Sequence, residues 1–186
     1  MLEQEYKQLI SPATFAALQD AFPWEETLQQ VNHYYTDVTG ELRRRNVSLR
    51  VRVKDGNCYL QAKLPVQNSG GLHINTELER PLDSVPALLS DDILREFLGF
   101  SVGEATLAGS LTTLRRVYRP CDGVELCLDE NHYPEHTDYE VELEFLGESP
   151  PSALMEILAA QGIDFSTDTQ GKYTRFIHAL NNITED

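Results

Sequence analysis

Polar and apolar residues alternate with a period of two along much of this chain. Because successive side chains of a strand point to opposite faces, the pattern predicts β-strands with one polar and one apolar face. The predicted strands cover about eight segments, at residues 2–10, 28–36, 47–54, 57–64, 72–80, 106–118, 123–130 and 138–146. The chain is therefore expected to be mainly β.

Short turns join several of these strands. Asp55-Gly56 and Asp122-Gly123 each separate two predicted strands, and such pairs are typical of two-residue β-hairpins. Strands joined in this way pair in antiparallel fashion, and about eight of them can close into a barrel. The sequence accordingly predicts a closed eight-stranded antiparallel β-barrel.

Helices are predicted in the gaps between the strands. Ser11-Pro12 has the form of an N-cap followed by proline at the first helical position. Further helices are predicted as one or two short segments within 83–98, and at 152–161 and 174–181. Their apolar stripes need apolar sheet surface to cover, which places the helices outside the barrel. We expect one α+β, mainly β domain over residues 1–186, with a frayed end at 184–186.

The polar faces of the predicted strands carry opposite charges on different strands. Glu140, Glu142 and Glu144 share one face of a strand, whereas Arg50 and Arg52 share a face of another. The simplest interpretation is the solvent-exposed side of an ordinary antiparallel sheet. Three carboxylates on one face repel one another, however, and a solvated face normally intersperses lysines. We therefore predict that the charged faces line the interior of the barrel.

A lumen with acidic and basic walls requires a ligand that matches both. Clustered carboxylates raise one another's pKa, and hard divalent cations such as Mg²⁺ or Mn²⁺ relieve that repulsion. Arginine and lysine bind phosphate oxygens, arginine often through two parallel hydrogen bonds. The pattern thus predicts a complex of a polyphosphate with divalent metal ions.

The chain as a whole is strongly acidic, since 15 Lys and Arg against 30 Asp and Glu give a net charge of −15. Such a charge disfavours non-specific binding to nucleic acid or to an anionic membrane. No apolar segment approaches the roughly 20 residues that span a bilayer, and the N-terminus lacks a signal-peptide pattern. Cys58, Cys121 and Cys127 show no CxxC spacing, so we expect reduced thiols in a cytoplasmic protein.

An ordered set of short motifs resembles one known family. Glu3-Gln4-Glu5-Tyr6-Lys7 matches the N-terminal ExExK signature of the CYTH superfamily, the triphosphate tunnel metalloenzymes, which include class IV adenylyl cyclases and thiamine triphosphatases. ExExK alone occurs by chance in many proteins. Here it is followed, in the family's order, by Leu49-Arg50-Val51-Arg52, Gln61-Ala62-Lys63, Glu77-Leu78-Glu79, Arg115-Arg116, Asp129, Glu140-Val141-Glu142-Leu143-Glu144 and Lys172. The resemblance therefore spans nearly the whole chain.

The resemblance implies a role for each matching residue. The metal-binding residues would be Glu3, Glu5, Glu79, Asp129, Glu140, Glu142 and Glu144, although which of the last three bind metal stays open. The triphosphate-binding residues would be Lys7, Arg50, Arg52, Lys63, Arg116 and Lys172. Arg115 and Arg116 are adjacent and must face opposite ways, and we expect Arg116 to face inward.

A tyrosine and a lysine complete the catalytic residues that the resemblance implies. Tyr34 would pair with Lys63 and help to activate water. The chain departs from the family at this point, because Tyr34-Tyr35-Thr36-Asp37 reverses the usual order of Asp and Thr.

Hydrolysis of a triphosphate is the expected function, with inorganic triphosphate first, then thiamine triphosphate or a nucleoside triphosphate. The alternatives are a class IV-type adenylyl cyclase and a non-catalytic module that binds polyphosphate or triphosphate. No adenine pocket is recognisable in the sequence, and the complete acidic set argues against a module without turnover. A homodimer, frequent in the family, stays open as the oligomeric state.

Three other features of the sequence are interpreted first as structural rather than as ligand-binding. His132 and His136 flank Tyr133-Pro134-Glu135 and are expected in a surface loop rather than a metal site. Arg43-Arg44-Arg45 is expected to be a solvated turn, with a guide for anions at the tunnel mouth as the alternative. Trp24 is expected to pack against the protein rather than to stack on a ligand.

Overall fold

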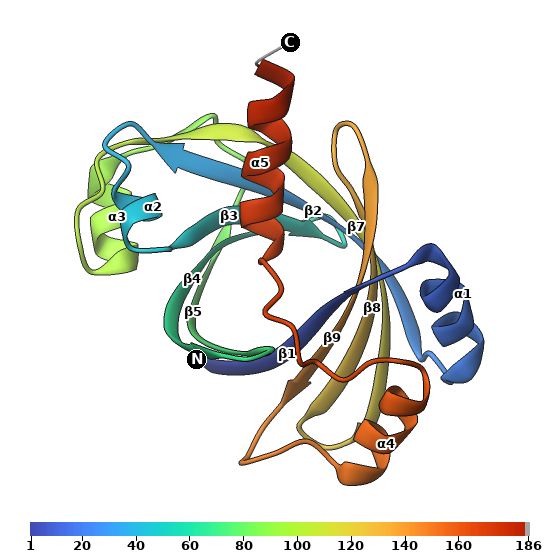
Figure 1. Cartoon of the computed structure of the whole chain (residues 1–186). Helices are drawn as coiled ribbons and strands as arrows, with labels where there is room; N and C mark the ends of the chain where they lie inside the picture. Colours follow the sequence, from blue (N-terminus) through green and yellow to red (C-terminus); the bar gives the residue numbers. More distant parts are fainter. Residues whose placement is uncertain (185–186) are drawn as a thin grey trace.

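The computed structural model describes residues 1–184, and within them nine strands form one sheet. Their order is β2-β3-β4-β5-β1-β9-β8-β7-β6, and pairing of β2 with β7 closes the eight long strands into a barrel (Figure 1). Every neighbouring pair is antiparallel. The predicted closed eight-stranded antiparallel barrel is confirmed.

The strands are close to those predicted from the period-two pattern. They are β1 (Leu2–Ile10), β2 (Glu26–Asp37), β3 (Ser48–Lys54), β4 (Asn57–Ser69), β5 (Leu72–Leu82), β6 (Leu88–Leu89), β7 (Ala105–Cys121), β8 (Val124–His132) and β9 (Thr137–Phe145). β4 runs five residues past its predicted end, and its pairing with β5 shifts in register between Pro65 and Gln67. Such an irregularity lets a strand continue through a proline that cannot donate a hydrogen bond.

The helices are α1 (Pro12–Ala21), α2 (Glu41–Arg44), α3 (Asp91–Leu98), α4 (Ser152–Ala160) and α5 (Lys172–Thr184). The Ser11 hydroxyl accepts from the Thr14 N–H, which confirms the predicted N-cap of α1. α2 was not predicted, because it is a single turn too short to show a helical period. Within 83–98 only the second half is helical, since the first half leads into β6. The last two residues of the expected frayed end lie outside the described residues.

Most of the hydrophobic core lies between the barrel and its helices, with two smaller clusters at the inner faces of the strands and under α5. One cluster joins α1 and α4 to the outer faces of β8 and β9, on the right of Figure 1. A second cluster joins α2 and α3 to β3 and β4, on the left. The inner faces of the strands therefore remain largely free for polar and charged side chains, as predicted.

α5 and the segment that leads to it cross one end of the ring of strands (Figure 1). Phe176 of α5 packs with Tyr34 of β2, and the ring centroids lie 5.0 Å apart. The seven residues 168–174 line the cavity inside the barrel, so this segment covers that end. No helix within residues 1–184 is long and apolar enough to cross a membrane.

Candidate functional site

The barrel encloses a cavity of about 520 Å³ whose lining is mostly polar and charged. Alternate residues of the strands supply this lining, because only every second side chain of a strand points inward. The charged residues among them are Glu3, Glu5, Lys7, Arg50, Arg52, Lys54, Lys63, Glu77, Arg115, Arg119, Glu125, Glu142, Glu144, Asp168 and Lys172. Acidic and basic side chains thus share one enclosed space.

The basic wall of the cavity is formed by β3. The Arg50 Nε donates to the Gln61 Oε1 at 2.7 Å, and the Arg52 Nε donates to the Asn32 Oδ1 at 2.9 Å. These partners are neutral amides, and the nearest carboxylate oxygen to Arg50, from Glu77, is 3.6 Å away. Burial, reinforced by the charge of Arg50, lowers the pKa of Arg52 to about 9. A buried guanidinium held by an amide is suited to binding an anion.

An acidic corner lies opposite this wall. Glu3, Glu5 and Glu144 each offer a carboxylate oxygen, and these oxygens lie within 4.8 Å of one another. The Oε1 of Glu5 contacts Lys7 at 2.6 Å and Lys63 at 3.4 Å, whereas its Oε2 has no hydrogen-bond partner among the described residues although Glu5 is only 1% exposed. A buried carboxylate oxygen left without a partner is unfavourable unless a cation completes it.

The repulsion among the carboxylates of the acidic corner is clearest in the pKa of Glu144. Burial raises the pKa of Glu144 to about 7, and the charges of Glu3 and Glu5 add to the effect. A divalent ion shared by the three carboxylates would remove both the repulsion and the unpaired oxygen. Oxygen donors of this kind are those that Mg²⁺ and Mn²⁺ prefer, so the residues present fit such an ion.

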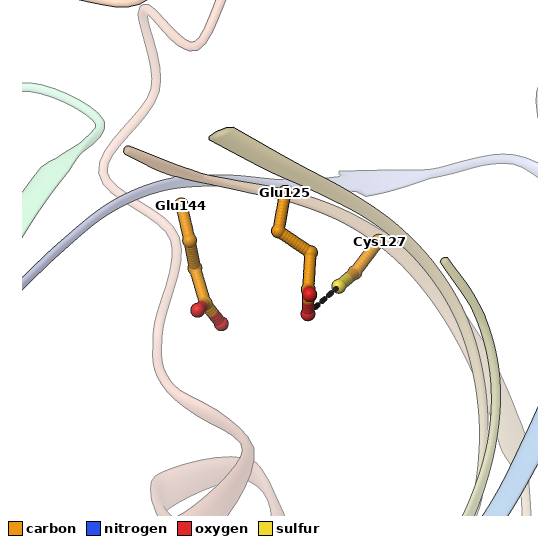
Figure 2. A group of neighbouring side chains, drawn as sticks. All are labelled: Glu125, Cys127 and Glu144. Carbon is orange, nitrogen blue, oxygen red and sulfur yellow. Dashed lines mark hydrogen bonds between the residues drawn. The ribbon is translucent and has the colours of Figure 1, made fainter. Parts of the chain in front are cut away.

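Glu144 also belongs to a neighbouring group with two β8 residues that the sequence did not single out. Figure 2 shows the Glu125 and Glu144 side chains pointing to the same side of the sheet, with the Cys127 Sγ 3.4 Å from a Glu125 oxygen. Cys127 is fully buried, and burial raises the pKa of its thiol. The alternation of β8 places both residues on the face of Asp129, which was the available signal for finding them.

A second acidic group lies toward α5 and differs in its charge balance. Its members, Asp129, Glu140 and Glu142, also have oxygens within 4.8 Å of one another. They form ion pairs with three cations, which are Arg115, Lys172 and Arg175. Unlike the corner at Glu5, this group has its negative charges matched by side chains of the protein.

Comparison with known proteins agrees with this geometry. Residues 1–167 match the CYTH domain family. The chain belongs to the CYTH family. This confirms the resemblance that the ordered motifs indicated.

Three CYTH-like relatives illustrate the range of the comparison. The chain is 28% identical over 181 residues to YjbK of Bacillus subtilis (strain 168), a proposed triphosphatase, with 94% of each chain covered. It is 26% identical to HpAC1 from Hippeastrum, a proposed adenylyl cyclase with a dominant triphosphatase activity, over 95% of each chain with a TM-score of 0.74. A proposed adenylate cyclase from Bacillus halodurans is 26% identical, over 92% of this chain and 95% of its own, with a TM-score of 0.68.

The prediction that Arg116 faces the CYTH tunnel is wrong, and Arg115 takes that position. Arg115 donates two hydrogen bonds to Asp129, at 2.8 and 2.7 Å. Arg116 points to the outside, where its guanidinium lies 5.6 Å from the Phe15 ring centroid in α1. Tyr118, which packs against the outer core, shares the face of Arg116 and was a sequence signal for this orientation.

The structure also places Glu79 outside the cavity. Glu79 is exposed and accepts a hydrogen bond from the Gln61 Nε2 at 2.6 Å, whereas Glu77, two residues earlier, lines the cavity. Glu79 is therefore not brought to the acidic corner where a metal would lie. Glu77 and Glu79 lie on the same face of β5, but the strand has already reached the rim of the barrel at Glu79.

Tyr34 and Lys63 both line the cavity, yet they meet different partners. The Lys63 Nζ lies 2.6 Å from Glu3 and 3.4 Å from Glu5. Tyr34 packs between Tyr173 and Phe176 at the end covered by α5. Their strands are separated by β3, so the expected pair is not formed among the described contacts.

The remaining sequence features have structural roles. The Trp24 indole N–H donates to the carbonyls of Leu18 and Gln19, which confirms a packing role. His132 lies 3.1 Å from Glu130, and His136 stacks on Tyr133. Within the described part of the chain, none of the groups able to hold a metal contains a histidine. Arg44 and Arg45 pair with Glu41 in α2.

Proposed function

We propose that this CYTH protein is a divalent-metal-dependent triphosphatase that hydrolyses inorganic triphosphate. The observation that carries the proposal is that one cavity contains both a cation and a carboxylate oxygen that lack partners of opposite charge. Among the described residues, Arg52 is a half-buried cation without a carboxylate partner, and Glu5 is a buried carboxylate with an unpartnered oxygen. A metal–triphosphate complex supplies the anion that the first requires and the cation that the second requires. The activities named for YjbK and HpAC1 support the same proposal.

The acidic corner would hold the metal through Glu3, Glu5 and Glu144. Once bound there, Mg²⁺ or Mn²⁺ supplies a Lewis acid for phosphoryl oxygens. Lys63 remains an ammonium at neutral pH, because Glu5 and Glu3 raise its pKa against the opposing effect of burial. Lys63 is therefore suited to orienting the substrate and stabilising charge on it, and not to taking a proton from water.

The basic wall would orient the substrate for attack at its terminal phosphoryl group. Arg50 and Arg52 would bind non-bridging oxygens and stabilise the charge that develops on the leaving diphosphate. Both arginines are held by amide oxygens of neighbouring strands, so little reorganisation is needed when substrate binds. Hydrolysis of this kind uses positioned charges rather than a covalent intermediate.

The lining of the cavity favours a small inorganic substrate over one with an organic ring. Among the described lining residues, Tyr34 and Tyr173 are the only ones with a phenyl, phenol or indole ring, and they pack against each other at the α5 end. A nucleobase or thiazole ring would find no free aromatic face there on which to stack. Inorganic triphosphate needs only the charged groups.

The test is to incubate the purified protein with Mg²⁺ or Mn²⁺ and tripolyphosphate, thiamine triphosphate or ATP. We expect orthophosphate release, fastest from tripolyphosphate. Pyrophosphate together with cyclic AMP from ATP would instead show an adenylyl cyclase. Tight binding of tripolyphosphate without any product would show a binding module, and either result would overturn the proposal.

Two matched carboxylate variants locate the metal requirement. Glu5→Gln removes the unpartnered oxygen and should lower kcat by at least about 100-fold at saturating metal. Glu79→Gln, which changes an exposed carboxylate outside the cavity, should leave kcat within about threefold of the wild type. Arg52→Ala should mainly raise KM. Equal losses in the two Glu variants would contradict the placement of the metal in the corner.

A further inference from the structure

The ammonium group of Lys172 lies among three buried carboxylates. Its Nζ is 2.9 Å from the Asp129 Oδ2, 2.5 Å from the Glu140 Oε2 and 2.6 Å from the Glu142 Oε1. The three acids are 0%, 0% and 6% exposed. They are also the members of the second acidic group, whose oxygens are close enough together to share one metal ion. Lys172 therefore lies where a divalent ion would otherwise be bound.

The charge of this group is balanced without a metal. Arg115 binds Asp129 through two hydrogen bonds and also contacts Glu142. Arg175 adds a third cation, with its Nη2 2.9 Å from Glu140 and its Nε 2.9 Å from Asp138. Each of the three carboxylates thus has two cationic side chains as partners.

The acidic corner at Glu5 does not have this balance. Lys63 and Lys7 contact Glu3 and Glu5, whereas the nearest cation to Glu144 is Arg115, whose Nη1 is 3.8 Å away. The same Arg115 already forms ion pairs with the second acidic group. One of the two groups therefore still needs a divalent ion, and the other does not.

The donors of Lys172 lead to the same conclusion. An ammonium group has three N–H donors and no acceptor. Lys172 donates a hydrogen bond to the Glu142 Oε1, and its Nζ also lies within ion-pair distance of Asp129 and Glu140. Lys172 differs in this from Arg52, whose partner is a single amide oxygen. These contacts favour a role in holding the three carboxylates over the direct triphosphate contact that the family resemblance implied.

We propose that Lys172 takes the place of a second divalent ion, so that the protein binds one metal ion, at Glu3, Glu5 and Glu144. This proposal rests on the proposed function only in placing that ion in the same cavity. Lys172 is then a positioning residue, since it holds Asp129, Glu140 and Glu142 in place without touching substrate. Because Lys172 begins α5, the built-in cation also fastens α5 over the end of the barrel.

The test counts bound Mn²⁺ in the absence of substrate, by the loss of the free-ion EPR signal and by calorimetry. We expect one Mn²⁺ per wild-type chain. Glu5→Gln should weaken that site by at least about tenfold, whereas Glu140→Gln should leave it unchanged. Lys172→Met should bind a second Mn²⁺, because it leaves three carboxylates with two cations.

Lys54→Met is the matched control for charge. Lys54 is a half-buried lysine that lines the same cavity, and it has no ion pair among the described contacts. The Lys54→Met variant should still bind one Mn²⁺, because the loss of the Lys54 charge leaves the ion pairs of the second acidic group intact. A second ion in both lysine variants would show only that a more negative cavity attracts metal, and would overturn the proposal.

Other outcomes also decide the matter. Two Mn²⁺ per wild-type chain, or one in a folded Lys172→Met variant, would overturn the proposal. Should Lys172→Met fail to fold, the pair Glu5→Gln and Glu140→Gln remains decisive, since loss of the ion in Glu140→Gln alone would overturn it. Activity is not used as a readout, so an inactive protein that binds one Mn²⁺ at Glu5 would refute the proposed function and leave this inference standing.

Discussion

Glu144 is the residue in which burial has the clearest consequence for the folded protein. Its pKa is raised from 4.5 to about 7 by burial, with Glu3 and Glu5 adding to the shift. The folded protein therefore binds this proton more tightly than the unfolded chain does. In the absence of metal, the contribution of Glu144 to stability is present below about pH 4.5 and is lost as the pH rises through about 7.

Glu144→Gln should remove this pH dependence. With EDTA present, the substitution should raise the free energy of unfolding at about pH 8 by about 1–2 kcal/mol, because a carboxylate charge that is only partly screened by solvent, on a side chain 32% exposed, no longer forms. The gain at about pH 5 should be less than half as large. Urea unfolding at both pH values measures it. Glu156→Gln, on the exposed side of α4, is the control and should have the same small effect at both. An equal gain at both pH values for Glu144→Gln would contradict the assignment.

Arg115 and Arg116 offer a second comparison between adjacent residues. Arg115→Met would leave Asp129 and Glu142 buried without a principal partner, and losing one side of a buried ion pair destabilises a protein by about 3–5 kcal/mol. Arg116→Met removes a half-buried side chain outside the barrel and should change stability by about 1 kcal/mol or less. Urea unfolding of both variants at neutral pH measures the difference. Similar losses would mean that both arginines are equally important to the fold.

The segment between α4 and α5 is fastened to the barrel by specific contacts. The Gln8 Oε1 of β1 accepts from the N–H groups of Asp164 and Phe165, and the Gln8 Nε2 donates to the Gly162 carbonyl. Gly71, in the turn between β4 and β5, approaches the same segment closely. A Cβ at Gly71 would lie 2.0 Å from the Phe165 carbonyl oxygen, so only glycine fits there without moving the backbone.

Gly71→Ala should therefore displace this segment and destabilise the protein by about 2–3 kcal/mol. Thermal and urea unfolding measure the loss. Gly171→Ala is the matched control, because a Cβ at Gly171 meets nothing within 4 Å. The control should change stability by less than about 1 kcal/mol. If Gly71→Ala were as stable as the control, the close contact between the turn and the segment would be wrong.

The elements themselves were mostly predictable. Eight strands alternate strongly enough for their period to identify them, and the Asp-Gly turns show which neighbours pair. α2 and β6 were missed because four and two residues are too few to show any period. The first half of the region 83–98 was expected to be helical, but it leads into β6, whose pairing with β7 is a long-range contact.

At the scale of the whole molecule, the cavity should couple metal binding to stability. A metal that binds only the folded barrel stabilises it by about 2.7 kcal/mol at 100 times its Kd. We expect saturating Mg²⁺ or Mn²⁺ to raise the melting temperature, and EDTA to reverse the rise. Differential scanning calorimetry measures both. Glu5→Gln should show little of the effect, and a full rise in that variant would place the stabilising ion elsewhere.

The sequence by itself determined the barrel and the charges of its lumen. Alternation with period two assigns each side chain to one face of its strand, and the apolar helices show which face is outside. Tertiary structure alone decided which charges meet. Lys172 and Arg175 of α5 contact Glu140, and no strand period predicts that contact. Glu79 lies outside the cavity because β5 has reached the rim of the barrel there. Ion pairing depends on distances of a few ångströms, which arise only when the barrel closes and α5 packs over its end.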